Sequence, residues 1–160
     1  MVKYIYYNNK GESIVMKIFI DADGCPVVDI AISISKEYHL NVVVVKNFAH
    51  RISDSYAEIV SVDIENDSAD FYIVNRIQKG DIVVTQDYGL AALCLSKGGL
   101  PINQNGLVYT KENIDGMLST RHVHQQLRRA GKKHSNPKKR KSENDEKFKY
   151  NFKKLIEESY

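Results

Sequence analysis

The sequence has few cysteines and no long apolar run, and each shortage argues against a class of protein. Cys25 and Cys94 are the only two cysteines among 160 residues, and without a secretory signal we expect both thiols to be reduced. No Cys-x-x-Cys or His-x-x-x-His spacing suggests a structural zinc site. No apolar run approaches the ~20 residues that span a bilayer, and residues 1–15 lack the features of a signal peptide. These absences favour a cytoplasmic protein.

The formal charge of +3 is unevenly distributed along the chain. Residues 1–120 contain 10 Lys and Arg against 15 Asp and Glu, a net charge of −5, and residues 121–160 contain 13 against 5, a net charge of +8. An acidic body with a basic end suits a protein that binds a metal in one place and a polyanion in another. The alternative is a solvated basic tail that only improves solubility.

Strand and helix patterns alternate through most of the chain. Apolar, β-branched runs that predict buried strands cover residues 17–20, 41–47, 57–63 and 81–87. Segments with helical periodicity or helix-capping residues cover 27–39, 68–79, 88–99, 111–131 and 147–159, and shorter strands are expected at 100–103 and 107–110. This order predicts an α/β fold, a three-layer α/β/α sandwich with a central, mainly parallel sheet and additional C-terminal helices.

The same pattern suggests four segments. Residues 1–15 are an N-terminal extension outside the compact pattern, expected to be a disordered arm or to follow an upstream start. Residues 16–131 form the α/β domain, 132–146 a basic charged linker, and 147–160 a C-terminal helix. The helix over 111–131 could be interrupted near Gly116.

Carboxylates stand at the ends of two predicted strands. Asp21 follows the strand over 17–20, and Asp87 ends the run over 81–87. Because functional sites of parallel sheets form at the carboxyl ends of the strands, both residues are expected on one rim. Asp23 lies two residues beyond Asp21, so its side chain returns to the same side of an extended chain.

A second pair of acids is predicted to reach this rim from the start of the helix over 68–79. Asp67 and Asp70 lie there, after a short loop. Converging carboxylates repel one another and raise each other's pKa, and Mg²⁺ or Mn²⁺ relieves that repulsion through oxygen ligands. The expected metal ligands are Asp21, Asp23, Asp67, Asp70 and Asp87, and the expected catalytic carboxylates are Asp21, Asp23, Asp70 and Asp87.

Other interpretations of these residues stay open at this point. Any single acid after a strand could be a helix cap or a turn residue. Cys25, near a helix start, could be a nucleophile, although nearby carboxylates oppose the thiolate. The stretch IFIDADGC also approaches the D-x-D-G-T signature of haloacid-dehalogenase-like phosphatases, with Asp21 and Asp23 as nucleophile and acid. The acidic pair of that family would need Asp81 and Asp87, which stand at opposite ends of one strand.

Several longer stretches together resemble the YaiI/YqxD family of bacterial proteins. They are IFIDADGCPV, DSADFYIVNRIQKGDIVVTQDYGLAALCLSKGG, INQNGLVYTKENIDGMLSTR and RRAG, and the resemblance runs from Met16 to about Gly131. The family looks like a member of the PIN-like superfamily, which implies an α/β/α sandwich whose acids bind Mg²⁺ or Mn²⁺ for RNA cleavage. Carried over to this chain, the resemblance implies metal-binding acids at Asp21, Asp70 and Asp87, with Thr85 as the polar residue before the last.

The basic residues toward the end of the chain are the candidate phosphate contacts. They comprise Arg121, Arg128, Arg129, Lys132, Lys133 and the run KKRK over 138–141. The leading hypothesis is a metal-dependent nuclease that acts on RNA. The alternatives are a non-catalytic module that binds nucleic acid or metal, and the phosphatase described above.

Overall fold

A computed structural model describes residues 5–7, 10–49, 51–64, 68–131 and 138–159, and for 5–7 the backbone alone. Its centre is a five-stranded parallel sheet with the order β5-β4-β3-β6-β7. The strands are β3 (Lys17–Asp21), β4 (Asn41–Asn47), β5 (Glu58–Val62), β6 (Ile82–Val84) and β7 (Leu100–Ile102). The four predicted strands and the parallel sheet are therefore confirmed, although β6 is shorter than the predicted run over 81–87 and ends at Val84.

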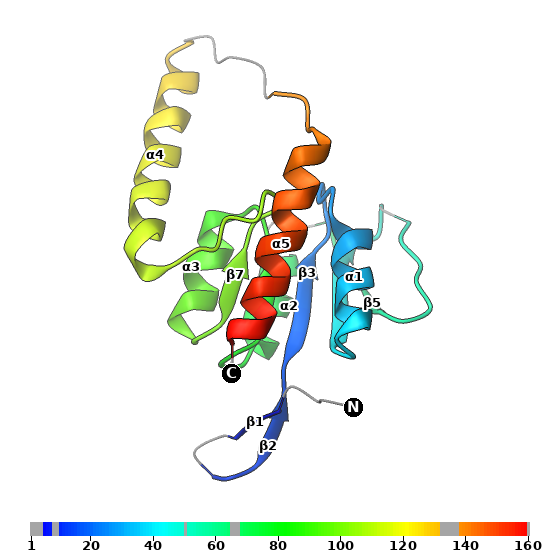
Figure 1. Ribbon diagram of the computed structural model, residues 1–160. Helices are drawn as coiled ribbons and strands as arrows, with labels where there is room; N and C mark the ends of the chain where they lie inside the picture. The colour runs from blue at the N-terminus through cyan, green and yellow to red at the C-terminus, as the bar shows by residue number, and fades with distance from the viewer. Residues whose placement is uncertain (1–4, 8–9, 50, 65–67, 132–137, 160) are drawn as a thin grey trace.

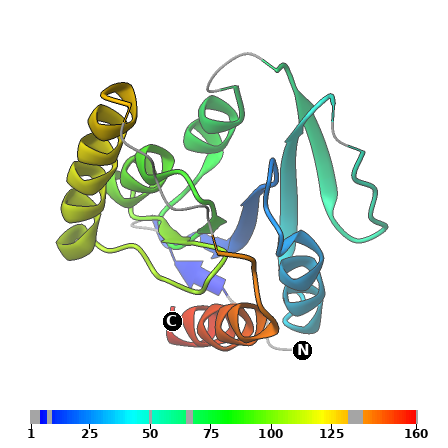
Figure 2. The ribbon, with the colours of Figure 1, turned by 90° about the horizontal axis from the view of Figure 1, so that it is seen from above.

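Helices cover both faces of this sheet, as Figures 1 and 2 show. One face carries α1 (Val28–Glu37) and α5 (Ser142–Glu158), and the other carries α2 (Ser68–Arg76) and α3 (Tyr88–Ser96). The remaining helix, α4 (Lys111–Arg129), packs beside α3. The arrangement is the predicted three-layer α/β/α sandwich.

The central strand β3 shows why this sequence forms a buried sheet. Ile18 and Ile20 point into the core under α1 and α5, whereas Phe19 points into the core on the side of α2 and α3. All three side chains are buried because both faces are covered. Ile20 is in register with Val44 and Val84. The carboxyl ends of β3, β4 and β6 therefore meet at the same rim.

Two local expectations differ from the structure. The stretch over 107–110 forms no strand; Val108 makes only an isolated antiparallel bridge with Ile102. The helix α4 runs without a break through Gly116. The Thr110 side chain accepts a hydrogen bond from Asn113 N, and the Asn113 side-chain oxygen accepts one from Thr110 N. This capping box fixes the start of α4.

The last helix is part of the main core. It begins at Ser142, five residues before the predicted 147, and its Phe148, Phe152 and Ile156 are fully buried. Gly106 makes room for it, because a Cβ there would lie 2.6 Å from Lys147 O. A side chain at this position would therefore push α5 away from the turn before α4.

The described part of the N-terminal extension forms a hairpin. Strands β1 (Ile5–Tyr7) and β2 (Ser13–Val15) pair antiparallel, and the hairpin projects from the body in Figure 1. The core begins at Met16, where the compact pattern was predicted to start. Among the helices within the described ranges, none is both long and apolar enough to cross a membrane.

Candidate metal and nucleic-acid site

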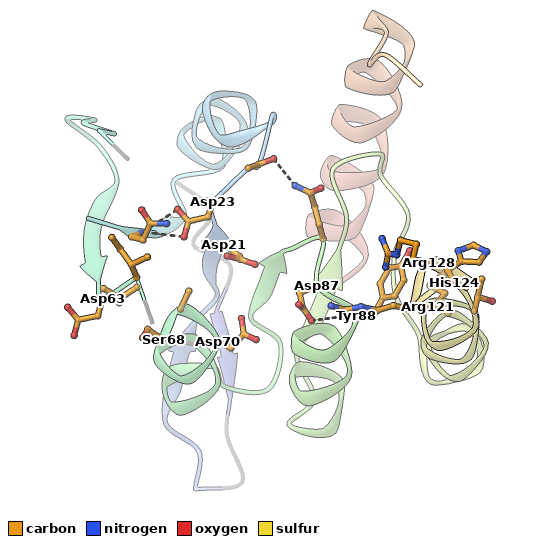
Figure 3. Close-up of a pocket in the computed structure, with 18 of the residues that line it drawn as sticks. Asp21, Asp23, Asp63, Ser68, Asp70, Asp87, Tyr88, Arg121, His124 and Arg128 are labelled. Atoms are coloured by element: carbon orange, nitrogen blue, oxygen red, sulfur yellow. Dashed lines mark hydrogen bonds and ion pairs between the residues drawn. The ribbon is translucent and has the colours of Figure 1, made fainter. Parts of the chain in front are cut away.

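A cavity of about 1320 Å³ lies at the carboxyl rim of the sheet, with α4 along one side. Five acids line it: Asp21, Asp23, Asp63, Asp70 and Asp87. The face of α4 that borders it contributes Asn113, Gly116, Met117, Thr120, Arg121, His124 and Arg128. Figure 3 shows Asp21, Asp70 and Asp87 around one shared space, with Arg121 beside Asp87 and with His124 and Arg128 on the far side of Asp87 from Asp21. The cavity thus has an acidic wall and a basic wall.

Asp21 is the last residue of β3 and is part of the acidic wall. Its Oδ2 accepts a hydrogen bond of 2.8 Å from the Thr85 hydroxyl. Burial raises the pKa of Asp21 to about 6, although the Thr85 hydrogen bond lowers it, and the nearby carboxylates of Asp23 and Asp87 raise it further. A buried carboxylate with like-charged neighbours is a position where a cation would be stabilised.

Asp87 caps α3 and also faces the cavity. Its Oδ1 accepts hydrogen bonds from Gly89 N at 2.7 Å and Leu90 N at 3.0 Å, which fixes the side chain at the helix start. Thr85 Oγ1 accepts a hydrogen bond of 3.0 Å from Asp87 N while its hydroxyl donates to Asp21. Thr85 therefore connects Asp21 and Asp87 through hydrogen bonds. Asp87 is both the N-cap of α3 and a residue that lines the cavity.

The other predicted acids reach the rim in different ways. Asp23 lies close to the end of β4, because both its oxygens are 3.2 Å from Asn47 N. Asp70 lies in the first turn of α2 and points toward the space beside Asp21 in Figure 3. Asp67 lies outside the described residues. Asp63 is exposed and also lines the cavity.

The carboxylates are spread around the cavity and do not form a closed ligand set. Among the described residues, no three Asp, Glu, His or Cys side chains are gathered closely enough to hold a metal ion directly. The donor chemistry nevertheless fits Mg²⁺ or Mn²⁺, which prefer oxygen ligands. Mg²⁺ in particular is usually held by one or two carboxylates with water and substrate phosphate completing the shell. The site fits such a hydrated ion, with Asp21 and Asp87 as the central pair.

The predicted phosphate contacts are only partly at this site. Arg121 and Arg128 line the cavity, and Arg129 is not among its lining residues. Lys132 and Lys133 lie outside the described residues. In the run over 138–141, Arg140 has a different role from the one suggested by its sequence context.

Arg140 connects the last helix to the turn before α4. Its guanidinium donates to Asp145 Oδ1 at 2.8 Å, to Asn105 Oδ1 at 2.9 Å and to Gln104 O at 2.7 Å. These three partners hold the start of α5 against the turn. In this structure its guanidinium therefore has partners within the chain, and its interpretation as a phosphate contact stays a prediction.

The sequence predicts Arg121 and Arg128 as phosphate contacts, but not the other polar residues on the same face of α4. Asn113, Thr120 and His124 line the cavity together with Arg128. Their spacing of seven, four and four residues is the signal that places side chains on one helical face.

Two alternative interpretations lose support from the geometry. Burial raises the pKa of the Cys25 thiol and the nearby Asp21 raises it further, which opposes a thiolate nucleophile. Asp81 lies at the amino end of β6, where it accepts hydrogen bonds from Lys17 N and Gln78 N. It is thus at the other end of the sheet from Asp87, as the spacing predicts, and the acidic pair of a haloacid-dehalogenase-like phosphatase is not assembled.

The fold and the site together define a class: an α/β/α sandwich protein with a carboxylate-lined cavity at the carboxyl rim of a parallel sheet. The family model described as "Uncharacterized BCR, YaiI/YqxD family" matches residues 19–158. The chain therefore belongs to the YaiI/YqxD family, and the match includes α5.

Curated relatives of similar length support the same assignment. A UPF0178 protein of Natranaerobius thermophilus is 49% identical over 141 residues, covering 88% of this chain and 96% of the relative. UPF0178 proteins of Alkaliphilus oremlandii and Exiguobacterium sibiricum are 53% and 51% identical, covering 83% and 89% of this chain and 86% and 98% of the relatives. No solved structure matches the chain.

Proposed function

We propose that this protein is a Mg²⁺- or Mn²⁺-dependent nuclease of PIN-like type that hydrolyses phosphodiester bonds in RNA. The observation that supports this most is the arrangement of three carboxylates from different elements around one cavity. Asp21 comes from β3, Asp70 from α2 and Asp87 from the start of α3, and the cationic face of α4 stands across from them. A phosphodiester is an anion whose hydrolysis needs cations on one side and a water activator beside it.

Each wall has its own role in this proposal. Asp21 and Asp87 would hold the divalent ion, and Asp23 and Asp70 would hold its water ligands. Such an ion would supply an activated water and would offset negative charge on the phosphate. In the hydrolysis a water oxygen bonds to phosphorus and gives its proton to a rim carboxylate, while the bond from phosphorus to the leaving sugar oxygen breaks and that oxygen takes a proton from solvent. Arg121 and Arg128 contact phosphates along the strand, which supplies affinity without sequence choice.

The decisive experiment is cleavage of an end-labelled single-stranded RNA with Mn²⁺, with Mg²⁺ and with EDTA. We expect cleavage only with a divalent ion, and loss of at least about a hundredfold in rate for Asp21→Asn and Asp87→Asn, because each removes a charge that acts in the transition state. The matched control is Asp115→Asn, an exposed acid on α4 that does not line the cavity. Wild-type rates in Asp21→Asn would contradict the proposal.

A non-catalytic metal- or nucleic-acid-binding module is the second candidate. The observation that favours it is the cationic face of α4, where Arg121 and Arg128 line the cavity and would bind phosphates without any hydrolysis. This alternative predicts that the purified protein binds Mn²⁺ and RNA, that Asp21→Asn weakens metal binding, and that no RNA is cut under any metal condition.

A further inference from the structure

The ion pair between the two walls of the cavity is a separate feature of the site. Arg121 Nη1 lies 3.5 Å from Asp87 Oδ1, the same oxygen that accepts hydrogen bonds from Gly89 N and Leu90 N. The Arg121 side chain is 52% exposed and that of Asp87 is 36% exposed, so the pair is open to solvent. Such a pair is weak and easily exchanged.

Arg121 therefore stands between two possible partners. On one side is a carboxylate that the proposed function assigns to a divalent ion, and on the other is the space where a phosphate would bind. A guanidinium and a metal ion on the same carboxylate repel each other. A phosphate group can accept two parallel hydrogen bonds from the guanidinium. The present contact to Asp87 involves a single carboxylate oxygen at 3.5 Å.

We propose that Arg121 couples the binding of metal and polynucleotide: it is the resident counter-ion of Asp87 and moves to a substrate phosphate when a divalent ion binds. The inference rests on the proposed function. Metal releases Arg121 for the phosphate, and the phosphate removes the cation that competes with the metal. Because coupling is reciprocal, each ligand tightens binding of the other. Arg121 is on this account a positioning residue and not a catalytic one.

The test is titration calorimetry with Mn²⁺ and with single-stranded oligodeoxythymidylate, each alone and in the presence of the other. The oligonucleotide supplies phosphates without the 2′-hydroxyl of RNA. In Arg121→Gln we expect Mn²⁺ alone to bind about two- to fivefold more tightly, the range that a partly exposed ion pair represents. We also expect the oligonucleotide to bind more weakly, and the mutual tightening to be smaller than in the wild type, where Arg121 adds to the direct attraction between metal and phosphate.

Two further variants separate this role from a general effect of charge. Arg128→Gln removes a charge that lines the cavity without an ion pair to Asp87 in the structure. The Arg128→Gln substitution should weaken oligonucleotide binding and leave the Mn²⁺ affinity close to that of the wild type. Lys111→Gln removes an exposed charge at the start of α4, away from the cavity, and should change neither. Surface substitutions of this kind leave the fold intact, which circular dichroism verifies.

The outcomes distinguish this inference from the function on which it rests. If the wild type binds no Mn²⁺, the proposed function and the coupling both fail. If the wild type binds Mn²⁺ but Arg121→Gln leaves that affinity unchanged or weaker, the coupling alone fails and Arg121 serves only to attach α4. The coupling is also overturned if Arg128→Gln tightens Mn²⁺ binding as much as Arg121→Gln does. The tighter binding would then come from the loss of any positive charge near the cavity.

Discussion

The two ends of the sheet each hold a carboxylate that is largely or fully buried, and the two are stabilised very differently. Asp81 at the amino end is 2% exposed and accepts hydrogen bonds from Lys17 N at 2.9 Å and Gln78 N at 2.8 Å. Asp21 at the carboxyl end accepts one hydrogen bond from the Thr85 hydroxyl and has Asp23 and Asp87 as charged neighbours. The first carboxylate connects chain segments, and the second is held in an environment that favours a ligand.

This difference teaches how to separate a structural acid from a functional one. Burial raises the pKa of both residues, so burial alone does not distinguish them. At Asp81 both oxygens accept backbone hydrogen bonds, which lower its pKa, whereas at Asp21 the neighbouring charges are of like sign. Both ends therefore carry a cost of burying a carboxylate, and only at the carboxyl end do like charges add to that cost.

The largest expected effect on stability is at Asp21. Its pKa is about 6 in the folded protein against 3.8 as the ordinary value, so the folded state binds a proton more tightly. The contribution of this group to the free energy of unfolding is fully present below pH 4. It is lost as the pH rises from about 4 to about 6, and the loss is at most about 3 kcal/mol. We expect Asp21→Asn to be more stable than the wild type at pH 7.5 in EDTA.

Urea unfolding at pH 4.5 and 7.5 measures this prediction. The wild type should lose more stability between the two pH values than Asp21→Asn does, and saturating Mn²⁺ should reduce the loss in the wild type only. Asp115→Asn is the control, since it removes an exposed acid. A variant with the same pH dependence as the wild type would show that Asp21 does not carry this cost.

Much of this comparison could be predicted from the sequence. The run KIFID and the stretch DIVVTQD gave β3 and β6 because both are apolar and β-branched, and the parallel order put Asp21 and Asp87 on one rim. The same run placed Asp81 at the other end. Spacing in a strand is rigid, and conclusions drawn from it are correspondingly reliable.

What the sequence did not predict depends on tertiary contacts. The basic run around Arg140 has the composition of a phosphate-binding tail, yet Arg140 is taken up by Asp145 and by the turn at 104–105. Which side of α4 faces the cavity depends on how the helix packs across from the rim. The composition shows which charged residues the chain contains, and the packing determines which of them lie at the site.

A smaller, opposite effect is expected at the amino end. In Asp81→Asn only one side-chain oxygen remains to accept from the backbone N–H groups of Lys17 and Gln78. The amide NH₂ of the new side chain then faces one of these two donors and cannot accept its hydrogen bond. An unsatisfied buried donor costs about 1–3 kcal/mol. We therefore expect a lower midpoint in urea and thermal unfolding at pH 7.5 in EDTA. Metal affinity per folded molecule should not change, because Asp81 is far from the cavity lining.

The comparison fails if Asp81→Asn is no less stable than Asp115→Asn, which should lie within about 0.5 kcal/mol of the wild type. It also fails if Asp81→Asn lowers Mn²⁺ affinity as strongly as Asp21→Asn does. Either result would mean that the two ends of the sheet are not divided into a structural and a functional end.

The smallest expected effect is at Gly116, on the wall of the cavity formed by α4. This glycine is inside a helix, and a Cβ built there meets no atom within 4 Å, so packing does not require it. Gly116→Ala should raise the free energy of unfolding by about 0.5–1 kcal/mol, because alanine is the better helix former. Gly116→Leu should keep most of that gain while its side chain occupies cavity space and weakens oligonucleotide binding. Urea unfolding and calorimetry on both variants measure the two effects separately. If leucine binds the oligonucleotide as well as glycine does, the face of α4 at this position lies outside the binding path, and the open space beside Gly116 has no role in the site.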